Sequence, residues 1–85
     1  MNIFFSSKAW NDYIYWQDQN KKIVKRINDL SKAIQREPYD GVGKPERLRF
    51  ELSDCYSRRI DQEHRLVYRI TDNVVHILAC RFHYQ

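Results

Sequence analysis

The chain has few of the residues that usually interrupt or brace a small fold. Its 85 residues include only two glycines, two prolines and two cysteines. So little glycine and proline excludes collagen-like, linker and low-complexity chains, which are rich in one or both. Cys55 and Cys80 belong to no CxxC or Cys/His ligand spacing. We therefore expect neither a disulfide framework nor a bound metal ion.

Long apolar segments are missing from the sequence as well. The longest, Val74 to Cys80, is interrupted by His76, and it is far shorter than the roughly 20 residues that a membrane-spanning helix needs. The first residues have neither the basic region nor the apolar run of a signal peptide. Together with the low cysteine content, these features predict a cytoplasmic protein without a membrane segment.

Apolar and aromatic residues, in contrast, are plentiful. Hydrophobic residues make up 42% of the chain, with six tyrosines, four phenylalanines and two tryptophans. Disordered chains lack such residues, and a chain of this length can bury about 60% of its unfolded surface in one core. We therefore predict a single folded domain over residues 1–85.

The net charge of +4 is concentrated in one segment. Six basic residues and one acid, Asp29, lie between positions 21 and 36. The basic residues are Lys21, Lys22, Lys25, Arg26, Lys32 and Arg36. Such a run is either a solvated helix face or a surface that contacts a polyanion such as RNA.

Two helices are predicted in the first half of the chain. A short strand at 2–5 leads into Ser6 and Ser7, which can cap a helix over 8–18. Apolar residues at 23, 24, 27, 30 and 34 have the spacing of an amphipathic helix over 21–36. Pro38 disfavours helical geometry at the residue before it, so this helix should end near Arg36.

The second half of the chain has strand-like composition. A loop over 38–45 contains every glycine and proline. The expected strands cover 46–52, 56–60, 64–71 and 74–82, with short polar connections. These elements predict an α+β domain, in which two helices cover one face of a four- to five-stranded, mainly antiparallel sheet and the other face is left free.

One pair of basic residues stands out in the predicted sheet. If the turn at 61–63 is centred on Gln62, Arg59 lies opposite Arg65, and like charges in that position destabilise a sheet. The pair can mark an anion-binding site. Alternatively, a nearby carboxylate neutralises it, and the candidates are Glu51, Asp54 and Glu63.

Other candidates are isolated polar side chains. His83 and Tyr84 lie next to the end of the chain, where either a packed or a functional terminus would explain them, and imidazole readily exchanges a proton near neutral pH. Glu46 follows the glycine-containing loop, from which a carboxylate can reach a ligand or simply face solvent. His64 and His76 have no partner visible in the sequence. The common nucleotide-binding, metalloprotease and serine-hydrolase motifs do not occur.

Taken over its whole length, the sequence closely resembles the Txe/YoeB family of bacterial toxins, relatives of the RelE fold that cleave messenger RNA on the ribosome. The resemblance runs from Ile3 to Tyr84. Its most specific stretches are 7–16 (SKAWNDYIYW), 41–46 (GVGKPE), 56–60 (YSRRI), 63–68 (EHRLVY) and 80–84 (CRFHY). It implies a RelE-like fold with an N-terminal strand.

The resemblance also implies an activity and the residues that carry it. The family's functional positions correspond here to Glu46, Arg65, His83 and Tyr84. It implies a ribonuclease without metal or cofactor, in which the ribose 2′-hydroxyl attacks the adjacent phosphate. Glu46 would be the general base, His83 the general acid and Arg65 the cation at the phosphate. Tyr84 would stack on or orient the RNA.

Further contacts are expected around these positions. Arg59, Arg49 and Lys44 are candidate phosphate-binding residues. The ribosome-contact candidates are Lys21, Lys22, Lys25, Arg26 and Lys32. Compared with the family, Arg49 replaces a common lysine, Phe82 a common tyrosine, and Gln85 extends the usual terminus.

The expected partners are messenger RNA, the ribosome and a cognate antitoxin whose disordered C-terminal segment covers the open sheet face. A homodimer is possible, and operator DNA would be contacted only through the antitoxin. Two alternatives remain. One is a ParE-like toxin that targets gyrase and needs no acid–base pair, and the other is a non-catalytic module that binds the antitoxin and acts as a co-repressor.

Overall fold

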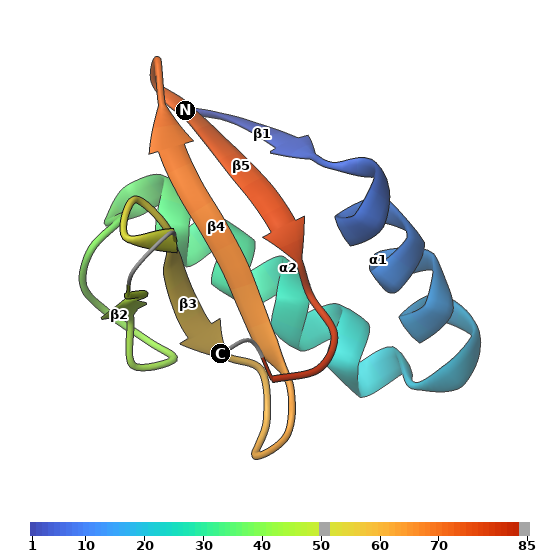
Figure 1. Ribbon diagram of the computed structural model, residues 1–85. Coiled ribbons are helices and arrows are strands. Elements are labelled where there is room, and N and C mark those ends of the chain that lie inside the picture. Colours follow the sequence, from blue (N-terminus) through green and yellow to red (C-terminus); the bar gives the residue numbers. More distant parts are fainter. Residues whose placement is uncertain (50–51, 84–85) are drawn as a thin grey trace.

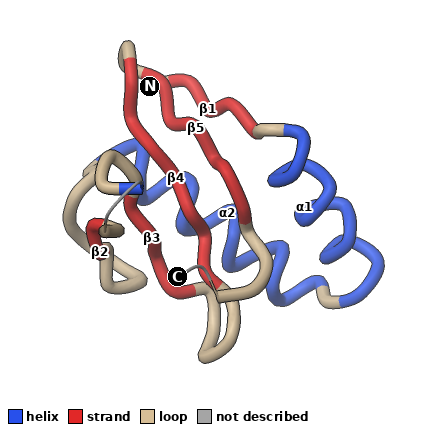
Figure 2. Tube along the Cα trace, in the orientation of Figure 1, coloured by secondary structure: helices blue, strands red, loops and turns tan. Residues whose placement is uncertain are grey.

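The computed structural model describes residues 1–49 and 52–83, and this part of the chain forms two helices and one five-stranded sheet. The elements are β1 (Asn2–Phe5), α1 (Ser7–Gln19), α2 (Lys21–Arg36), β2 (Glu46–Arg47), β3 (Tyr56–Arg59), β4 (Arg65–Thr71) and β5 (Val74–Ala79). The strands lie in the order β1-β5-β4-β3-β2 (Figure 1 and Figure 2).

The sheet is mixed, with one parallel pairing. β1 runs parallel to β5, whereas the three other pairings are antiparallel. Both helices contribute to one core on the same side of the sheet, and α2 passes behind the strands in Figure 1. The predicted α+β arrangement is confirmed. No helix in the described ranges is both long and apolar enough to cross a membrane.

Both helices begin at side-chain caps. The Oγ of Ser6 accepts the amide of Ala9 at 3.1 Å and donates to the carbonyl of Leu78 at 3.1 Å, so the cap also ties α1 to the end of β5. Asn20 separates the two helices and caps α2 by accepting the amide of Lys22 at 3.1 Å. The gap between the helices predicted over 8–18 and 21–36 is therefore one residue long, because α1 continues to Gln19.

The main core lies between the helices and the sheet. Ile27, Leu30 and Ile34 on α2 are completely buried against Leu66 of β4 and Ile77 of β5. Each such side chain contributes about 1.5–3 kcal/mol by leaving water. This burial holds α2 on one face and leaves the opposite face of the sheet uncovered by helices.

All four strands predicted in the second half are shorter in the structure, those over 56–60 and 64–71 by one residue each and the other two by more. The expected strand over 46–52 ends at Arg47, because Leu48 and Leu52 pack into a small cluster with Cys55 instead of alternating between faces. Residues 50 and 51 lie outside the described part. The expected strand over 74–82 ends at Ala79, because α1 side chains take both backbone groups of Cys80.

A buried arginine fixes the loop that leads into β2. The Arg58 guanidinium donates to the carbonyls of Glu37, Asp40 and Val42, at distances from 2.6 to 3.1 Å. Its Nε also donates to the hydroxyl of Tyr68 at 3.2 Å. Because buried carbonyls need such partners, Arg58 holds the loop in the position from which Glu46 enters the sheet.

Candidate functional site

The candidate site lies on the face of the sheet opposite the helices. Pairing across the strands aligns Glu46 of β2 with Ser57 of β3, Ser57 with Val67 of β4, and Val67 with Ala79 of β5. Directly paired residues share a face of the sheet, with their Cβ atoms about 5 Å apart. Glu46 therefore points to the open face, and its side chain is exposed.

The predicted pairing of the two arginines is confirmed. Arg59 pairs with Arg65 across β3 and β4, and both lie two residues along from the Ser57–Val67 pair, on the same face. Both therefore belong to the end of the open face that Glu46 borders. Arg65 Nη1 donates to the carbonyls of Asp61 and His64 at 3.0 and 3.1 Å.

Neutralisation by a neighbouring carboxylate is not observed for this pair. Within residues 1–49 and 52–83, no carboxylate lies within ion-pair distance of Arg59 or Arg65. Asp54 lies 3.7 Å from Arg69, and Glu63 lies 3.6 Å from the ring of His64. Glu51 lies outside the described residues. The two paired arginines therefore place two positive charges at one end of the open face.

The segment after β5 carries His83 to the same end of the face. The Phe82 carbonyl accepts the amide of Arg65 at 3.0 Å, and the Phe82 amide donates to Nδ1 of His64 at 2.7 Å. His83 is the next residue and is exposed. The backbone hydrogen bond between Phe82 and Arg65 therefore places the next residue, His83, close to Arg65 along the chain. Tyr84 lies outside the described residues.

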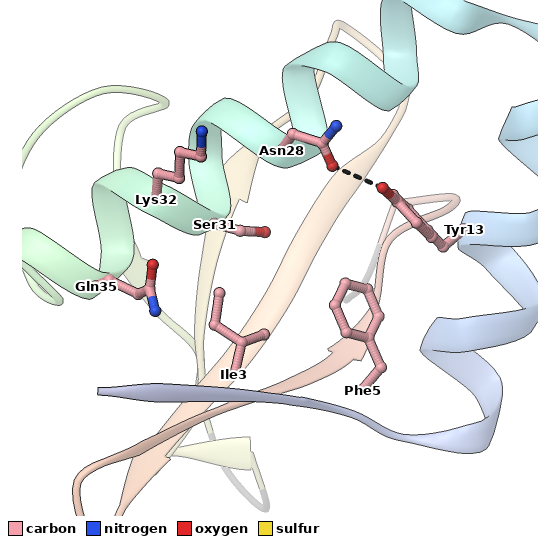
Figure 3. A pocket seen from close by; sticks show the side chains of 7 residues that line it. All are labelled: Ile3, Phe5, Tyr13, Asn28, Ser31, Lys32 and Gln35. Carbon is pink, nitrogen blue, oxygen red and sulfur yellow. Dashed lines mark hydrogen bonds between the residues drawn. The ribbon is translucent and has the colours of Figure 1, made fainter.

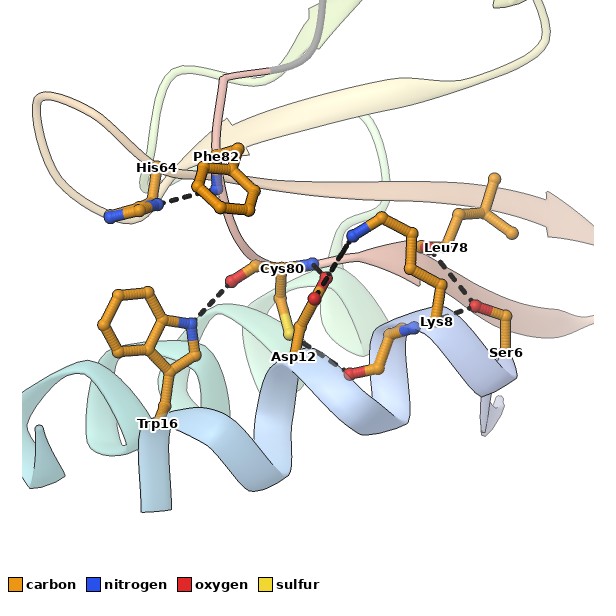
Figure 4. Close-up of polar contacts among 9 residues, drawn as sticks. Ser6, Lys8, Asp12, Trp16, His64, Leu78, Cys80 and Phe82 are labelled. Carbon is orange, nitrogen blue, oxygen red and sulfur yellow. Dashed lines mark hydrogen bonds and ion pairs between the residues drawn. The ribbon is translucent and has the colours of Figure 1, made fainter. Parts of the chain in front are cut away.

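The base of this segment is anchored to α1. Figure 4 shows Cys80 held from both sides: its amide donates to Asp12 at 3.0 Å, and its carbonyl accepts the Trp16 indole N–H at 2.9 Å. Asp12 is also paired with Lys8 at 2.9 Å. Burial raises the pKa of the Cys80 thiol to about 12, and the nearby Asp12 carboxylate adds to the rise.

The remaining basic candidates are spread over the molecule. Lys44 lies in the loop before β2, and Arg49 follows this strand; both are exposed. The basic residues of α2 lie in the helical layer, on the other side of the sheet from Glu46 and Arg65. Arg26 of α2 reaches the sheet and donates to the carbonyl of Arg59 at 3.0 Å. A nucleic acid bound by the basic face of α2 would thus lie on a different surface from one bound at Glu46 and Arg65.

A pocket lies away from the open face, between β1 and the two helices (Figure 3). Phe5 and Tyr13 form one side, and the Tyr13 hydroxyl donates to Asn28 at 2.7 Å. Its other lining residues are Ile3, Ser31, Lys32 and Gln35. In the described ranges, no three histidine, cysteine, aspartate or glutamate side chains are grouped as metal ligands would be.

Sequence reasoning missed three residues of this region. Asp12, Trp16 and His64 bond to backbone groups that are 68, 64 and 18 residues away along the chain. The spacing of neighbouring residues in the sequence does not indicate contacts between residues that lie so far apart along the chain. The only signal was that all three lie in the most specific stretches of the family resemblance, Asp12 and Trp16 in 7–16 and His64 in 63–68.

Known proteins resemble this chain over its full length. Toxin YoeB of Synechocystis is 55% identical over 85 residues, which cover 100% of this chain and 99% of the relative. A solved YoeB/ParE toxin from Agrobacterium tumefaciens has a TM-score of 0.96 at 40% identity, covering 99% of this chain and 100% of that one.

Two solved structures of Staphylococcus aureus YoeB are also similar. One is a YoeB–YefM complex, with 52% identity and a TM-score of 0.91, and the other is a YoeB dimer, with 50% identity and a TM-score of 0.92. Each covers 99% of this chain and 98% of the solved chain. The model of the YoeB-like toxins of bacterial type II toxin–antitoxin systems matches residues 5–84. With its RelE-like α+β fold, the chain belongs to this family of YoeB-like toxins.

Proposed function

We propose that this toxin is a ribosome-dependent endoribonuclease that cleaves messenger RNA and so inhibits translation in the cytoplasm. The observation that carries the proposal is the convergence on one end of the open face. A carboxylate, Glu46, borders the paired residues Arg59 and Arg65, and the segment after β5, here called the tail, brings the backbone at His83 beside Arg65. A base, an acid and a cation are the groups that this reaction requires.

In the proposed reaction, the ribose 2′-hydroxyl is the nucleophile. Glu46 accepts its proton as the O2′–P bond forms. His83 donates a proton to the 5′-oxygen as the P–O5′ bond breaks. The products are a 2′,3′-cyclic phosphate and a free 5′-hydroxyl, and the two proton transfers leave Glu46 protonated and His83 neutral.

Charge stabilisation in this scheme comes from the arginine pair. Negative charge accumulates on the phosphoryl oxygens in the transition state, and the guanidinium groups of these paired residues stabilise it. The mutual repulsion of Arg59 and Arg65 is relieved when an anion lies between them. Lys44 and Arg49 contact flanking phosphates, and Tyr84 stacks on a base.

The proposed partners follow from the same surfaces. The basic residues of α2 contact ribosomal RNA phosphates, and a cognate antitoxin covers the open face with a C-terminal segment that folds on binding. The antitoxin, rather than the toxin, contacts operator DNA. A homodimer is a further possibility to be tested by the mass of the purified toxin in solution.

Cleavage mapping on translating ribosomes tests the proposal against both alternatives. The purified toxin is incubated with ribosomes translating a defined message, and the ends of the message are mapped. We expect cleavage that needs ribosomes. A parallel assay measures DNA supercoiling by gyrase. Inhibited supercoiling with an intact message would support a ParE-like target, and inactivity in both assays would leave a non-catalytic antitoxin-binding module.

A further inference from the structure

We propose that His64 is a positioning residue, which holds the C-terminal segment so that His83 reaches the scissile phosphate. This inference rests on the proposed ribonuclease function. His64 does not belong to the site itself, since its ring is buried between α1 and the segment after β5. Figure 4 shows it joined to the backbone of Phe82.

The first step of the argument concerns the tautomer of His64. Its Nδ1 lies 2.7 Å from the amide nitrogen of Phe82, and a backbone amide can only donate. Nδ1 must therefore be an unprotonated acceptor, and the proton of the neutral ring lies on Nε2. That nitrogen lies 3.6 Å from a carboxylate oxygen of Glu63, which favours the same tautomer.

The second step concerns the orientation of the ring. The Trp16 indole contacts the imidazole edge-on, with ring centroids 4.7 Å apart, and Asp61 accepts the backbone amide of His64 at 2.7 Å. The Phe82 ring covers another side at 6.0 Å. These contacts come from α1, from the turn before β4 and from the tail, so the acceptor atom has a fixed direction.

The third step concerns the conformation that this contact maintains. Phe82 has a φ of 70°, in the left-handed region that bulky residues rarely adopt. Strained backbone of this kind persists only where the surroundings enforce it, and it is frequent at functional sites. Phe82 is bonded on both sides, through its amide to His64 and through its carbonyl to Arg65. The unusual turn redirects the chain so that His83 follows beside Arg65.

Substitutions of His64 separate this role from simple packing. Asparagine places an acceptor oxygen at the position of Nδ1, whereas leucine fills similar space without an acceptor. We expect His64→Leu to lower the single-turnover cleavage rate by about 10²-fold, as misplacement of a reacting group by about 1 Å can, and His64→Asn to restore most of it. Affinity for the ribosome should be unchanged in both, since the basic residues of α2 are untouched.

Hydrogen exchange gives a readout that does not depend on cleavage. The Phe82 amide should lose protection in His64→Leu and keep it in His64→Asn, while amides of β1 stay protected in both. His76→Leu is the matched control, because His76 lies on β5 and contacts Thr71 and Phe4 instead of the tail.

The outcomes distinguish the two proposals. Equal protection of the Phe82 amide in His64→Leu and His64→Asn overturns the positioning role, whatever the cleavage assay gives. Cleavage by His64→Leu at the wild-type rate overturns it as well. If the unaltered toxin cleaves no RNA, the ribonuclease function fails and the catalytic consequence of this contact fails with it. The exchange data still decide whether His64 orders the tail.

Discussion

Two like charges face each other at Arg59 and Arg65, and an isolated sheet would not favour that arrangement. Like charges directly opposite each other destabilise a sheet. Neither guanidinium is ion-paired with a carboxylate in the described part of the chain, while Arg69, four residues further along β4, lies near Asp54. This difference between Arg69 and the Arg59–Arg65 pair supports the proposal that the pair binds a phosphate of the RNA.

Removing either proposed proton-transfer group should abolish most of the activity without unfolding the chain. Loss of a positioned acid or base typically costs about 10²–10⁴ in rate. We therefore expect His83→Ala and Glu46→Ala to be nearly inactive in single-turnover cleavage on ribosomes and to unfold at wild-type urea concentrations, because both side chains are exposed. His76→Ala and Asp18→Ala are the matched controls. Wild-type rates for His83→Ala would remove the acid assignment.

Cys80 makes the stability of the fold depend on alkaline pH. Its thiol has a pKa of about 12 in the folded chain, raised from 9.0 chiefly by burial. The unfolded chain then loses this proton first as pH rises, so the stabilisation is complete below pH 9 and is lost progressively toward pH 12. The free energy of unfolding should fall by up to about 1.4 kcal/mol per pH unit in that window through this group.

Urea unfolding of the unaltered chain and Cys80→Ala at several pH values between 8 and 11 measures this effect. The difference in unfolding free energy between the two should shrink as pH rises. If the unfolding free energies of the two proteins change in parallel with pH, the Cys80 thiol does not have a higher pKa in the folded chain than in the unfolded chain. Tyr68, whose pKa is also raised by burial, contributes equally to both proteins and cancels.

The functional residues that were predicted from the sequence and those that were not differ in how far along the chain their partners lie. The Arg59–Arg65 pairing was predictable because a short turn fixes the register of its two strands. His64 and Trp16 act on tail atoms that the fold alone brings near, so their spacing in the chain carries no information. The positions of Glu46 and His83 on one face depend on the same long-range arrangement.

At the scale of elements, the loop before β2 should be sensitive to a single methyl group. Gly43 has a φ of 88°, and a Cβ there would lie 2.9 Å from a Leu30 methyl group and 3.0 Å from the Cβ of Arg58. Gly41 has a φ of 113°, but its added Cβ would meet only the end of Arg58, at 3.5 Å. Both replacements by alanine strain the backbone, and only Gly43→Ala also overpacks the core.

We expect Gly41→Ala to cost about 1–3 kcal/mol through backbone strain and Gly43→Ala about 1–3 kcal/mol more through overpacking. Urea midpoints of both variants measure the difference. Gly43→Ala should also slow cleavage, because Gly43 lies in the loop only three residues before Glu46, the first residue of β2. Equal urea midpoints for the two variants would mean that the loop accommodates the methyl group at position 43 without further loss of stability.

Periodicity predicted the elements that bury one continuous face. The α2 bounds agree with the prediction at both ends, because its apolar spacing and Pro38 act locally. The strand expected over 46–52 was wrong beyond Arg47. Beyond Arg47, Leu48 and Leu52 pack against Cys55, Val67 and Ala79 in a second cluster on the open face of the sheet. An alternation of apolar and polar residues along one strand cannot predict such a cluster.

At the scale of the whole molecule, the antitoxin should bind the open face and displace the tail. The strain at Phe82 lowers the cost of releasing the segment that follows β5. Displacement breaks the bond from the Phe82 amide to His64, so this amide should exchange faster in the complex with the cognate antitoxin. Unchanged protection at Phe82, with the Arg65 side chain covered, would identify simple occlusion instead.

The chemical ends of the cleaved message distinguish attack by the 2′-hydroxyl from hydrolysis by a metal-activated water. Attack by the 2′-hydroxyl leaves a 2′,3′-cyclic phosphate or a 3′-phosphate on one fragment and a 5′-hydroxyl on the other. We predict these ends after cleavage on translating ribosomes, at the same rate after brief chelation that leaves the ribosomes intact. A 3′-hydroxyl paired with a 5′-phosphate, or cleavage that EDTA abolishes at constant ribosome integrity, would contradict an acid–base mechanism at Glu46, Arg65 and His83.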